Sequence, residues 1–382
     1  MKTTFAENPA RNRNYALDLL RIIAMWMIVL HHILGHGGVM EQTDSVFYYG
    51  LLILWNACAI SVNLYVLISG YFLVTQKFRP SKLLRLYIEV VFYCLVWYIY
   101  ALVSGQETFA FSSFLISVFF PFTSEQYWFL SAYFLMYLLS PVLNFFIKKM
   151  SKRQHLIVCL GLFLLFSVWV EIYPHLNLNI FNFGNGYSFH WFLVLYFFAA
   201  YLRLHADPKK WKRPLFWAFV FLAIMTALTT IQTRFAASIA LVKMWQGHFN
   251  RFNSILTVLL SLSVFTAFLK WEVRGKIVQK LIAIAAPLTL GVYLNHVNPY
   301  SVNLIWHTLL HTERIPSSIL VFPQIFLLVT LVLIACMAID WVRSCIFSLW
   351  EKRDFYRKAL DKFDSFILSA LQKMRAGLEE KI

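Results

Sequence analysis

The chain has 382 residues, of which 60% are hydrophobic and only 14% are charged, and its mean hydropathy is +0.65. This composition excludes an ordinary soluble domain. The formal net charge of +16 would suit a nucleic-acid partner, but apolar runs long enough to span a bilayer recur along nearly the whole chain. We therefore predict an all-α polytopic membrane protein with no nucleic-acid partner, since a transmembrane β-barrel would show short alternating segments.

The first predicted span, residues 17–36, follows a short basic tail (1–16). It reads LDLLRIIAMWMIVLHHILGH, and its ionisable side chains are Asp18, Arg21, His31, His32 and His36. Such groups are costly in hydrocarbon, so they should face protein or a cavity. At about 100° per residue, all of them except His31 fall on one face of a helix. The rise from Arg21 to His32 is about 16 Å, or half a hydrocarbon core.

Nine further apolar segments follow in the chain. They cover about 47–74, 84–104, 128–147, 155–173, 189–204, 214–233, 252–269, 280–300 and 318–341. After the third span, FSSFLISVFFPF indicates a short re-entrant or interfacial piece, and residues 351–382 resemble an amphipathic helix at the membrane surface. We predict a membrane domain of about ten helices over 17–345, between a cytoplasmic tail (1–16) and a cytoplasmic C-terminal helix (351–382).

Positive charge is distributed unevenly over the loops. All but four of the 34 Lys and Arg residues fall in the N-terminal region up to Arg21, in the even-numbered loops or in the C-terminal region. The positive-inside rule then places both termini in the cytoplasm, with the protein integral to the plasma membrane. The exceptions, which could meet an anionic acceptor outside, are Arg234, Lys243, Arg251 and Arg314. Topology therefore explains most of the basic excess.

Several kinds of site are not indicated. The cysteines, Cys58, Cys94, Cys159, Cys336 and Cys345, lie in or beside apolar runs without the spacing of metal ligands, so we expect reduced packing residues and no metal. There is no glycine-rich phosphate loop and no nucleophile elbow. The Gly/Pro-broken helix pair of many transporters is also not evident.

His32 is the strongest candidate for chemistry. An imidazole can take a proton from a hydroxyl near neutral pH, as acyl transfer to an alcohol requires. The alternative is a histidine hydrogen-bonded within the bundle. Arg21 and Asp18 on the same face favour function, with Arg21 holding an anionic donor and Asp18 as its counter-ion. Arg21 is also explained as a snorkelling cytoplasmic anchor, and we expect His31 and His36 to be structural.

Further candidates lie on either side of the membrane. The loop KFRPSKLLR puts Lys77, Arg79, Lys82 and Arg85 at the cytoplasmic mouth. These four cations could bind a phosphate-rich cofactor such as coenzyme A, or membrane topology alone could explain them. On the far side, Tyr127, Trp128 and the Asn- and Gly-rich loop 174–190 offer aromatic faces and amides for a sugar, although interfacial aromatic belts are common. His296, in GVYLNH, is either a deep substrate contact or a structural histidine.

With these residues, the sequence resembles the acyltransferase 3 family of integral-membrane acyltransferases, which includes many bacterial polysaccharide O-acetyltransferases. The resemblance rests on the acidic residue, arginine and histidine of the first span with the family's spacing. It also rests on the segments NLYVLISGYFL (63–73), KFRPSKLLRLY (77–87), YWFLSAYFLMYLLSP (127–141) and LGVYLNH (290–296). It implies a ten-helix bundle, cytoplasmic acetyl-CoA as the donor, His32 as the essential histidine and Arg21 as its partner. The family's cytoplasmic arginines map loosely onto Arg79 and Arg85. The family often has adjacent arginines at the place where this chain has Lys82.

We therefore expect an O-acyltransferase that moves an acetyl or similar short acyl group from acyl-CoA to a hydroxyl of a cell-envelope polysaccharide or its lipid-linked precursor. The expected site comprises His32, Arg21 and Asp18 for catalysis, Arg79, Lys82 and Arg85 for acetyl-CoA, and Tyr127, Trp128 and His296 for the saccharide. His32 would act as general base or as transient acyl carrier. The alternatives are a polysaccharide or lipid-linked sugar exporter, a succinyltransferase of the same fold, or a peptide or small-molecule acceptor. Further expected partners are the lipid bilayer and other envelope-biosynthesis proteins.

Overall fold

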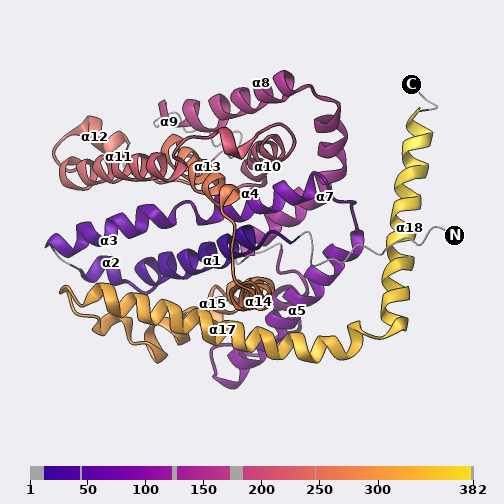
Figure 1. Cartoon of the computed structure of the whole chain (residues 1–382). Coiled ribbons are helices and arrows are strands. Elements are labelled where there is room, and N and C mark those ends of the chain that lie inside the picture. The colour runs from indigo at the N-terminus through magenta and orange to yellow at the C-terminus, as the bar shows by residue number, and fades with distance from the viewer. Residues whose placement is uncertain (1–12, 44, 123–126, 173–183, 246, 380–382) are drawn as a thin grey trace.

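The computed structural model is a bundle of helices (Figure 1), and it describes residues 13–43, 45–122, 127–172, 184–245 and 247–379. Within these ranges there is no strand. Eight helical segments of the described chain are long and apolar enough to cross a membrane: Tyr15–Gly35, Val46–Leu73, Pro80–Val103, Trp128–Lys149, Lys152–Ile172, Pro214–Phe235, Lys276–His296 and Val321–Glu351. Two shorter apolar helices, α10 (Phe189–Leu204) and α13 (Ile255–Lys270), have 16 residues each.

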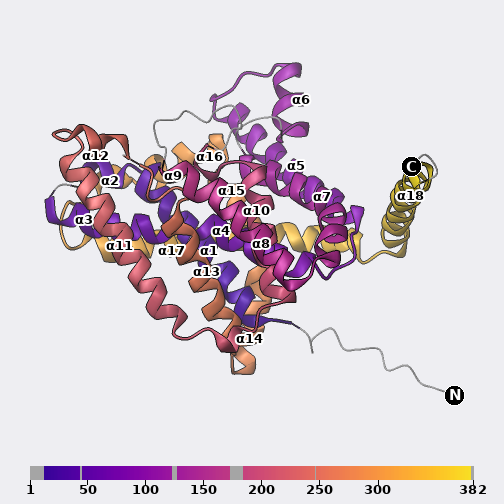
Figure 2. The ribbon, with the colours of Figure 1, turned by 90° about the horizontal axis from the view of Figure 1, so that it is seen from above.

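The all-α polytopic fold is thus confirmed. The ten predicted spans each coincide with one of these segments, while the number that cross the membrane and the side of the termini stay predictions. The predicted short piece after the third span is a helix, α6 (Phe111–Phe119), which projects beside α5 (Pro80–Val103) in Figure 2. All five cysteines are free, and four of them are buried.

Helix α1 (Tyr15–Gly35) lies inside the bundle. The Asn14 side chain caps it by accepting a hydrogen bond from the Leu17 N–H (3.0 Å). It ends before Gly38, whose φ of 70° is in the left-handed region that favours glycine. Helix α1 packs against α3 (Ser45–Cys58), α4 (Ser61–Leu73), α13, α14 (Lys276–Ala285), α15 (Thr289–His296) and α17 (Val321–Glu351). Helix α1 is therefore surrounded by other helices of the bundle.

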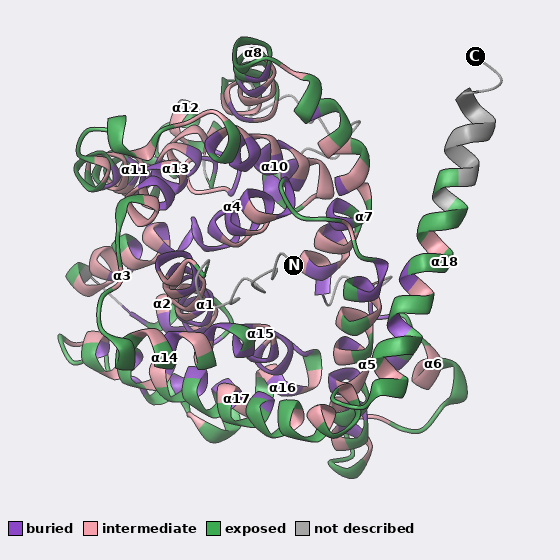
Figure 3. Ribbon diagram, turned by 45° about the vertical axis from the view of Figure 1, so that its right-hand side comes forward, coloured by how far each residue is buried: buried purple, intermediate pink, exposed green. Residues whose placement is uncertain are grey.

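Two apolar clusters form the core, and α1 belongs to both. Its first turns, through Leu17, Leu20 and Ala24, join a cluster built mainly by α4, α7 (Trp128–Lys149), α10 and α13. Its later turns, from Met25 to Leu34, join a cluster built by α5, α15 and α17. Figure 3 shows buried residues concentrated on α4 and α10, whereas α8 (Lys152–Phe163), α11 (Pro214–Phe235) and α17 carry exposed ones. Many of the exposed side chains are large and apolar, as a lipid-facing surface requires.

A close approach joins α15 to α17. A Cβ added at Gly291 would fall on the carboxyl group of Asp340, so only glycine fits there. Asp340 is fully buried, and its Oδ1 accepts hydrogen bonds from the Tyr93 hydroxyl (2.7 Å) and from Arg343 Nε (2.6 Å). Arg343 Nη2 also pairs with Glu89 Oε1 at 3.1 Å. The Asp340 carboxylate is thus satisfied inside the bundle by partners on two helices.

Helix α17 leads into α18 (Asp354–Glu379), the predicted C-terminal helix, which lies across one end of the bundle in Figures 1 and 2 and contacts α5. The remaining helices of the described chain are short: α2 (Val39–Gln42), η3 (Leu164–Val168), α9 (Trp169–Ile172), η5 (Gly184–Gly186), η6 (Pro208–Lys210), α12 (Ala240–Met244), η7 (Ala286–Leu288), α16 (Pro299–Asn303), η8 (Leu304–Leu309) and η9 (Thr312–Arg314). Pro287 lies in η7, where it interrupts the segment between α14 and α15.

Candidate active site

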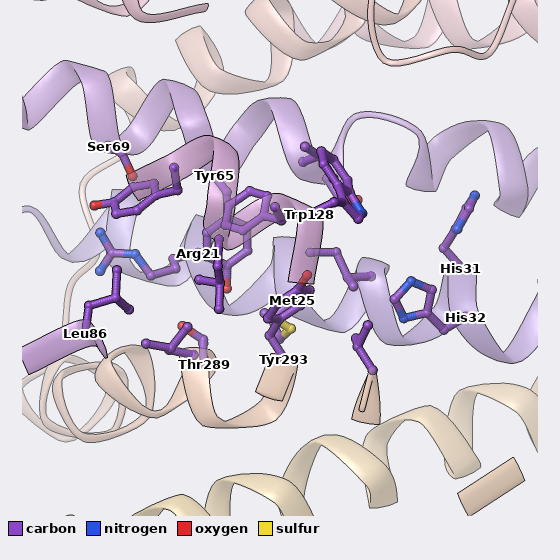
Figure 4. Close-up of a pocket in the computed structure, with 18 of the residues that line it drawn as sticks. Arg21, Met25, His31, His32, Tyr65, Ser69, Leu86, Trp128, Thr289 and Tyr293 are labelled. Carbon is purple, nitrogen blue, oxygen red and sulfur yellow. The ribbon is translucent and has the colours of Figure 1, made fainter. Parts of the chain in front are cut away.

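A cavity of about 1050 Å³ lies beside α1. Arg21, His32 and His36 all line it, as expected from their shared face, and Figure 4 shows Arg21 and His32 well separated along its wall. His31 also lines the cavity, from a different angle, and its ring lies against Trp55 with 3.9 Å between centroids. The cavity is large enough for a drug-sized ligand and more, because typical ligand pockets are about 300–1,000 Å³.

An ion-pair network holds Arg21. Asp18 Oδ1 accepts from Arg21 Nη1 at 3.0 Å, while Asp18 Oδ2 accepts from Arg13 Nε at 2.6 Å. Asp18 is 8% exposed and is not one of the described residues that line the cavity. Its place fits the expected counter-ion of Arg21 and not a direct substrate contact. Arg21 itself lies at the same end of the cavity as Ser69 and Leu86 (Figure 4).

The His32 imidazole is linked to a second histidine. His32 Nδ1 lies 2.9 Å from Nε2 of His296, and Nδ1 of His296 lies 2.6 Å from the Val292 carbonyl oxygen. His296 is fully buried and, among the described residues, is not part of the cavity wall. The structure thus places His296 against His32 and outside the cavity wall, which favours the structural alternative over a substrate contact. The centroid of the His36 ring lies 5.1 Å from that of His32.

Three aromatic side chains gather where Trp128 enters the cavity wall. The Trp128 ring is 4.6 Å from the Tyr187 ring and 5.9 Å from the Phe252 ring, with which it stacks at 18°. All three line the cavity. Asn63 holds Phe252 through a hydrogen bond from its Nδ2 to the Phe252 carbonyl (2.8 Å). At Gly186, with a φ of 83°, a Cβ would lie 2.7 Å from that of Phe252, so glycine permits this packing.

These aromatic residues were only partly predictable. Trp128 was a candidate and Tyr187 belongs to the expected loop 174–190, although residues 174–183 of that loop lie outside the described chain. Phe252 gave no signal because it resembles any apolar residue at the start of a span. Tyr127, in contrast, is fully buried and is not among the described cavity-lining residues. Its hydroxyl donates to the Leu294 carbonyl (3.1 Å) and accepts from Asn298 (2.8 Å), so its contacts are structural.

The basic residues expected to hold the donor lie in two places, one in the cavity wall and the others against α18. Lys82 lines the cavity, and its Nζ donates to Gln76 Oε1 (2.9 Å), which also lines it. Arg79 instead forms ion pairs with Asp361 and Asp364 of α18, both at 3.1 Å. Neither Arg79 nor Arg85 is among the described residues of the cavity wall. Of the three, only Lys82 is placed as we expected for a donor-binding group.

Helix α18 engages both of these arginines. The Arg85 guanidinium lies over the Tyr356 ring, 5.7 Å from its centroid. Asp364 accepts from the Ser81 N–H (2.6 Å) and hydroxyl (2.8 Å) in the first turn of α5. Burial raises the pKa of the Asp364 carboxyl, but these hydrogen bonds and the Arg79 charge outweigh it and hold the pKa below its ordinary value. The feature of the sequence that could have indicated this contact is the pair Asp361 and Asp364, one helical turn apart in α18.

A family model described as an acyltransferase domain matches residues 14–341. The match begins at the N-cap of α1 and ends within α17, so it includes every described residue that lines the cavity. No curated protein and no solved structure matches the chain significantly.

Proposed function

Since the chain belongs to the acyltransferase 3 family, it is a membrane acyltransferase, and we propose that it moves an acetyl or similar short acyl group from acyl-CoA to a hydroxyl of a cell-envelope saccharide or its lipid-linked precursor. One observation carries this proposal: a single cavity is lined by the cations Arg21 and Lys82, by the imidazole of His32 and by the aromatic ring of Trp128. In this proposal, the two cations bind an anionic donor, the imidazole is the base, and the aromatic ring is a surface for a sugar ring.

The donor would enter past Lys82 and Arg21. Both carry positive charge, and guanidinium groups match phosphate oxygens in geometry. Arg21 and His32 are about 16 Å apart along α1, so Arg21 is too far from His32 to polarise a thioester carbonyl beside that imidazole. We assign Arg21 to holding the donor, and the thioester to the region of His32. The expected cofactor sites at Arg79 and Arg85 are not part of this proposal, because α18 occupies both side chains.

The chemistry is acyl transfer with general-base catalysis. His32 takes the proton of the acceptor hydroxyl, and the hydroxyl oxygen attacks the carbonyl carbon of the thioester. The carbon–sulfur bond breaks, and the thiolate of coenzyme A leaves and takes the proton from the His32 imidazolium. No net proton is released. In the covalent variant, a nitrogen of His32 first carries the acyl group, and rapid-quench labelling with radiolabelled acetyl-CoA distinguishes the two routes.

The acceptor would lie against Trp128, Tyr187 and Phe252. Ligand sites combine apolar or aromatic walls with a few polar groups that fix orientation, and these three rings lie in the wall of the cavity that also contains His32. A sugar ring packed on this aromatic cluster would direct a hydroxyl toward the imidazole.

A deletion strain tests the proposal. We expect it to lose envelope O-acetyl groups, and we expect wild-type protein but not His32→Ala to restore them at equal membrane expression. Mass spectrometry of the envelope polymer identifies the added group and separates acetyl from succinyl transfer. Restoration by His32→Ala would contradict the role of His32. Accumulation of saccharide inside the deletion strain, with unchanged acylation, would instead indicate an exporter.

A further inference from the structure

We infer that His296 is a positioning residue that fixes the tautomer of His32, so that Nε2 of His32 is the basic nitrogen. This rests on the proposed function, in which His32 is the base. The observation is a chain of two hydrogen bonds that runs from His32 Nδ1 to His296 Nε2 (2.9 Å) and from His296 Nδ1 to the Val292 carbonyl (2.6 Å).

The positions of the protons follow from the last acceptor in this chain. A carbonyl oxygen can only accept, so the Val292 contact requires a proton on Nδ1 of His296. His296 is fully buried, and a second proton on its ring would bury a charge. Its Nε2 therefore carries a lone pair, and the proton between the two rings belongs to Nδ1 of His32. The remaining nitrogen of His32, Nε2, then has the free lone pair that a base needs.

The arrangement also suits the charged state of His32. When Nε2 takes the hydroxyl proton, His32 becomes an imidazolium whose Nδ1–H still donates to His296. A charged donor makes this hydrogen bond stronger than the neutral one. His296 thus orients the base in the way that a third group orients the base of a nucleophile–base pair. Because it acts through His32 and does not line the cavity, it should change turnover and leave donor binding intact.

Two substitutions test this role in the full-length protein. His296→Leu keeps an apolar side chain of similar bulk but cannot accept a hydrogen bond, and we expect kcat to fall by about 100-fold or more with the KM for acetyl-CoA unchanged. His296→Gln can present its amide oxygen to His32 Nδ1, and we expect it to recover kcat to within about tenfold of wild type. The matched control is His155→Leu, because His155 is also fully buried and its Nε2 also contacts a backbone carbonyl, that of Phe197 (3.1 Å).

The outcomes separate this inference from the proposed function. Wild-type kcat in His296→Leu would overturn it, as would equal losses in the Leu and Gln variants beside an active His155→Leu. Nitrogen-15 NMR of histidine-labelled protein reads the tautomer without any activity measurement, and we expect the signal absent in His32→Gln to show a protonated Nδ1 and an unprotonated Nε2. The opposite tautomer would overturn the inference. Absence of acetyl-CoA-dependent transfer by wild-type protein would instead reject the proposed function.

Discussion

Arg21 and His32 line one cavity from the same helix, eleven positions apart in the sequence. Their side chains share a face because eleven residues complete nearly whole turns, and they are about 16 Å apart along the axis. In the proposed function, the group that binds donor charge and the group that performs the chemistry are therefore physically separate. Substitutions at the two ends should change different kinetic constants.

Arg21→Gln should weaken donor binding. Hydrogen bonds to charged groups contribute about 1.5–3 kcal/mol, so we expect the KM for acetyl-CoA to rise by about 10- to 100-fold while kcat changes little. Steady-state kinetics in reconstituted membranes measures both constants. The control is Lys209→Gln, which removes an exposed cation in η6. A loss confined to kcat in Arg21→Gln would show that Arg21 acts on the chemical step instead.

Trp128→Ala should weaken acceptor binding. The substitution removes the ring that contacts Tyr187 and Phe252 in the cavity wall, and loss of about 1.4 kcal/mol or more corresponds to at least a tenfold rise in acceptor KM. Titration of the acceptor at saturating acetyl-CoA gives the value. Trp217→Ala, on α11 and 49% exposed, is the matched control and should leave acceptor KM unchanged. Equal effects of both substitutions would argue against a sugar site at Trp128.

Gly291→Ala should destabilise the protein, because the added methyl group falls on the Asp340 carboxyl. Overpacking of this kind costs about 1–3 kcal/mol. Thermal unfolding in detergent should give a lower Tm than wild type. Gly161→Ala in α8 is the control, since a Cβ there meets nothing within 4 Å. If the two variants have the same Tm, the approach of α15 to α17 is looser than the structure shows.

Asp364→Asn should release α18 from α5, whereas Asp361→Asn should have a smaller effect. The Asp364 side chain is 10% exposed and the Asp361 side chain 69% exposed, and exposed ion pairs contribute only about 0–1 kcal/mol. Hydrogen exchange along α18 measures docking. Faster exchange in Asp361→Asn than in Asp364→Asn would reverse the assignment.

The docking of α18 should also depend on pH in one direction. The pKa of Asp364 is held below its ordinary value of 3.8 when α18 is docked. The ionised carboxylate therefore supports docking fully above that ordinary value, and this support is lost as the pH falls through the lowered pKa. Exchange of wild-type α18 should be constant with pH, after correction for intrinsic rates, between about pH 5 and 8. A marked change within that range would show that another group controls docking.

The sequence predicted features that depend on local periodicity. The shared face of Arg21 and His32 follows from helix geometry alone. The apolar segments could be recognised because their lengths match the thickness of a bilayer. Contacts between distant residues could not be predicted in this way. His32 and His296 are 264 residues apart, and Arg79 and Asp364 are 285 apart. The direction in which a single side chain points could not be predicted from the sequence either. Tyr127 and Trp128 are neighbours, yet of the two only Trp128 lines the cavity.

The tie between Asp364 and the start of α5 has a consequence for biogenesis. Because the chain is synthesised from its N-terminus, the Arg79 loop is made long before α18 exists and retains its full positive charge while the early spans are inserted and oriented. Helix α18, which is made later, then pairs Asp361 and Asp364 with the Arg79 guanidinium. With the predicted topology, Arg79 would serve in turn as an orienting charge for the nascent chain and as an anchor for α18. A chain truncated before α18 should therefore insert in the same orientation as the chain that contains α18.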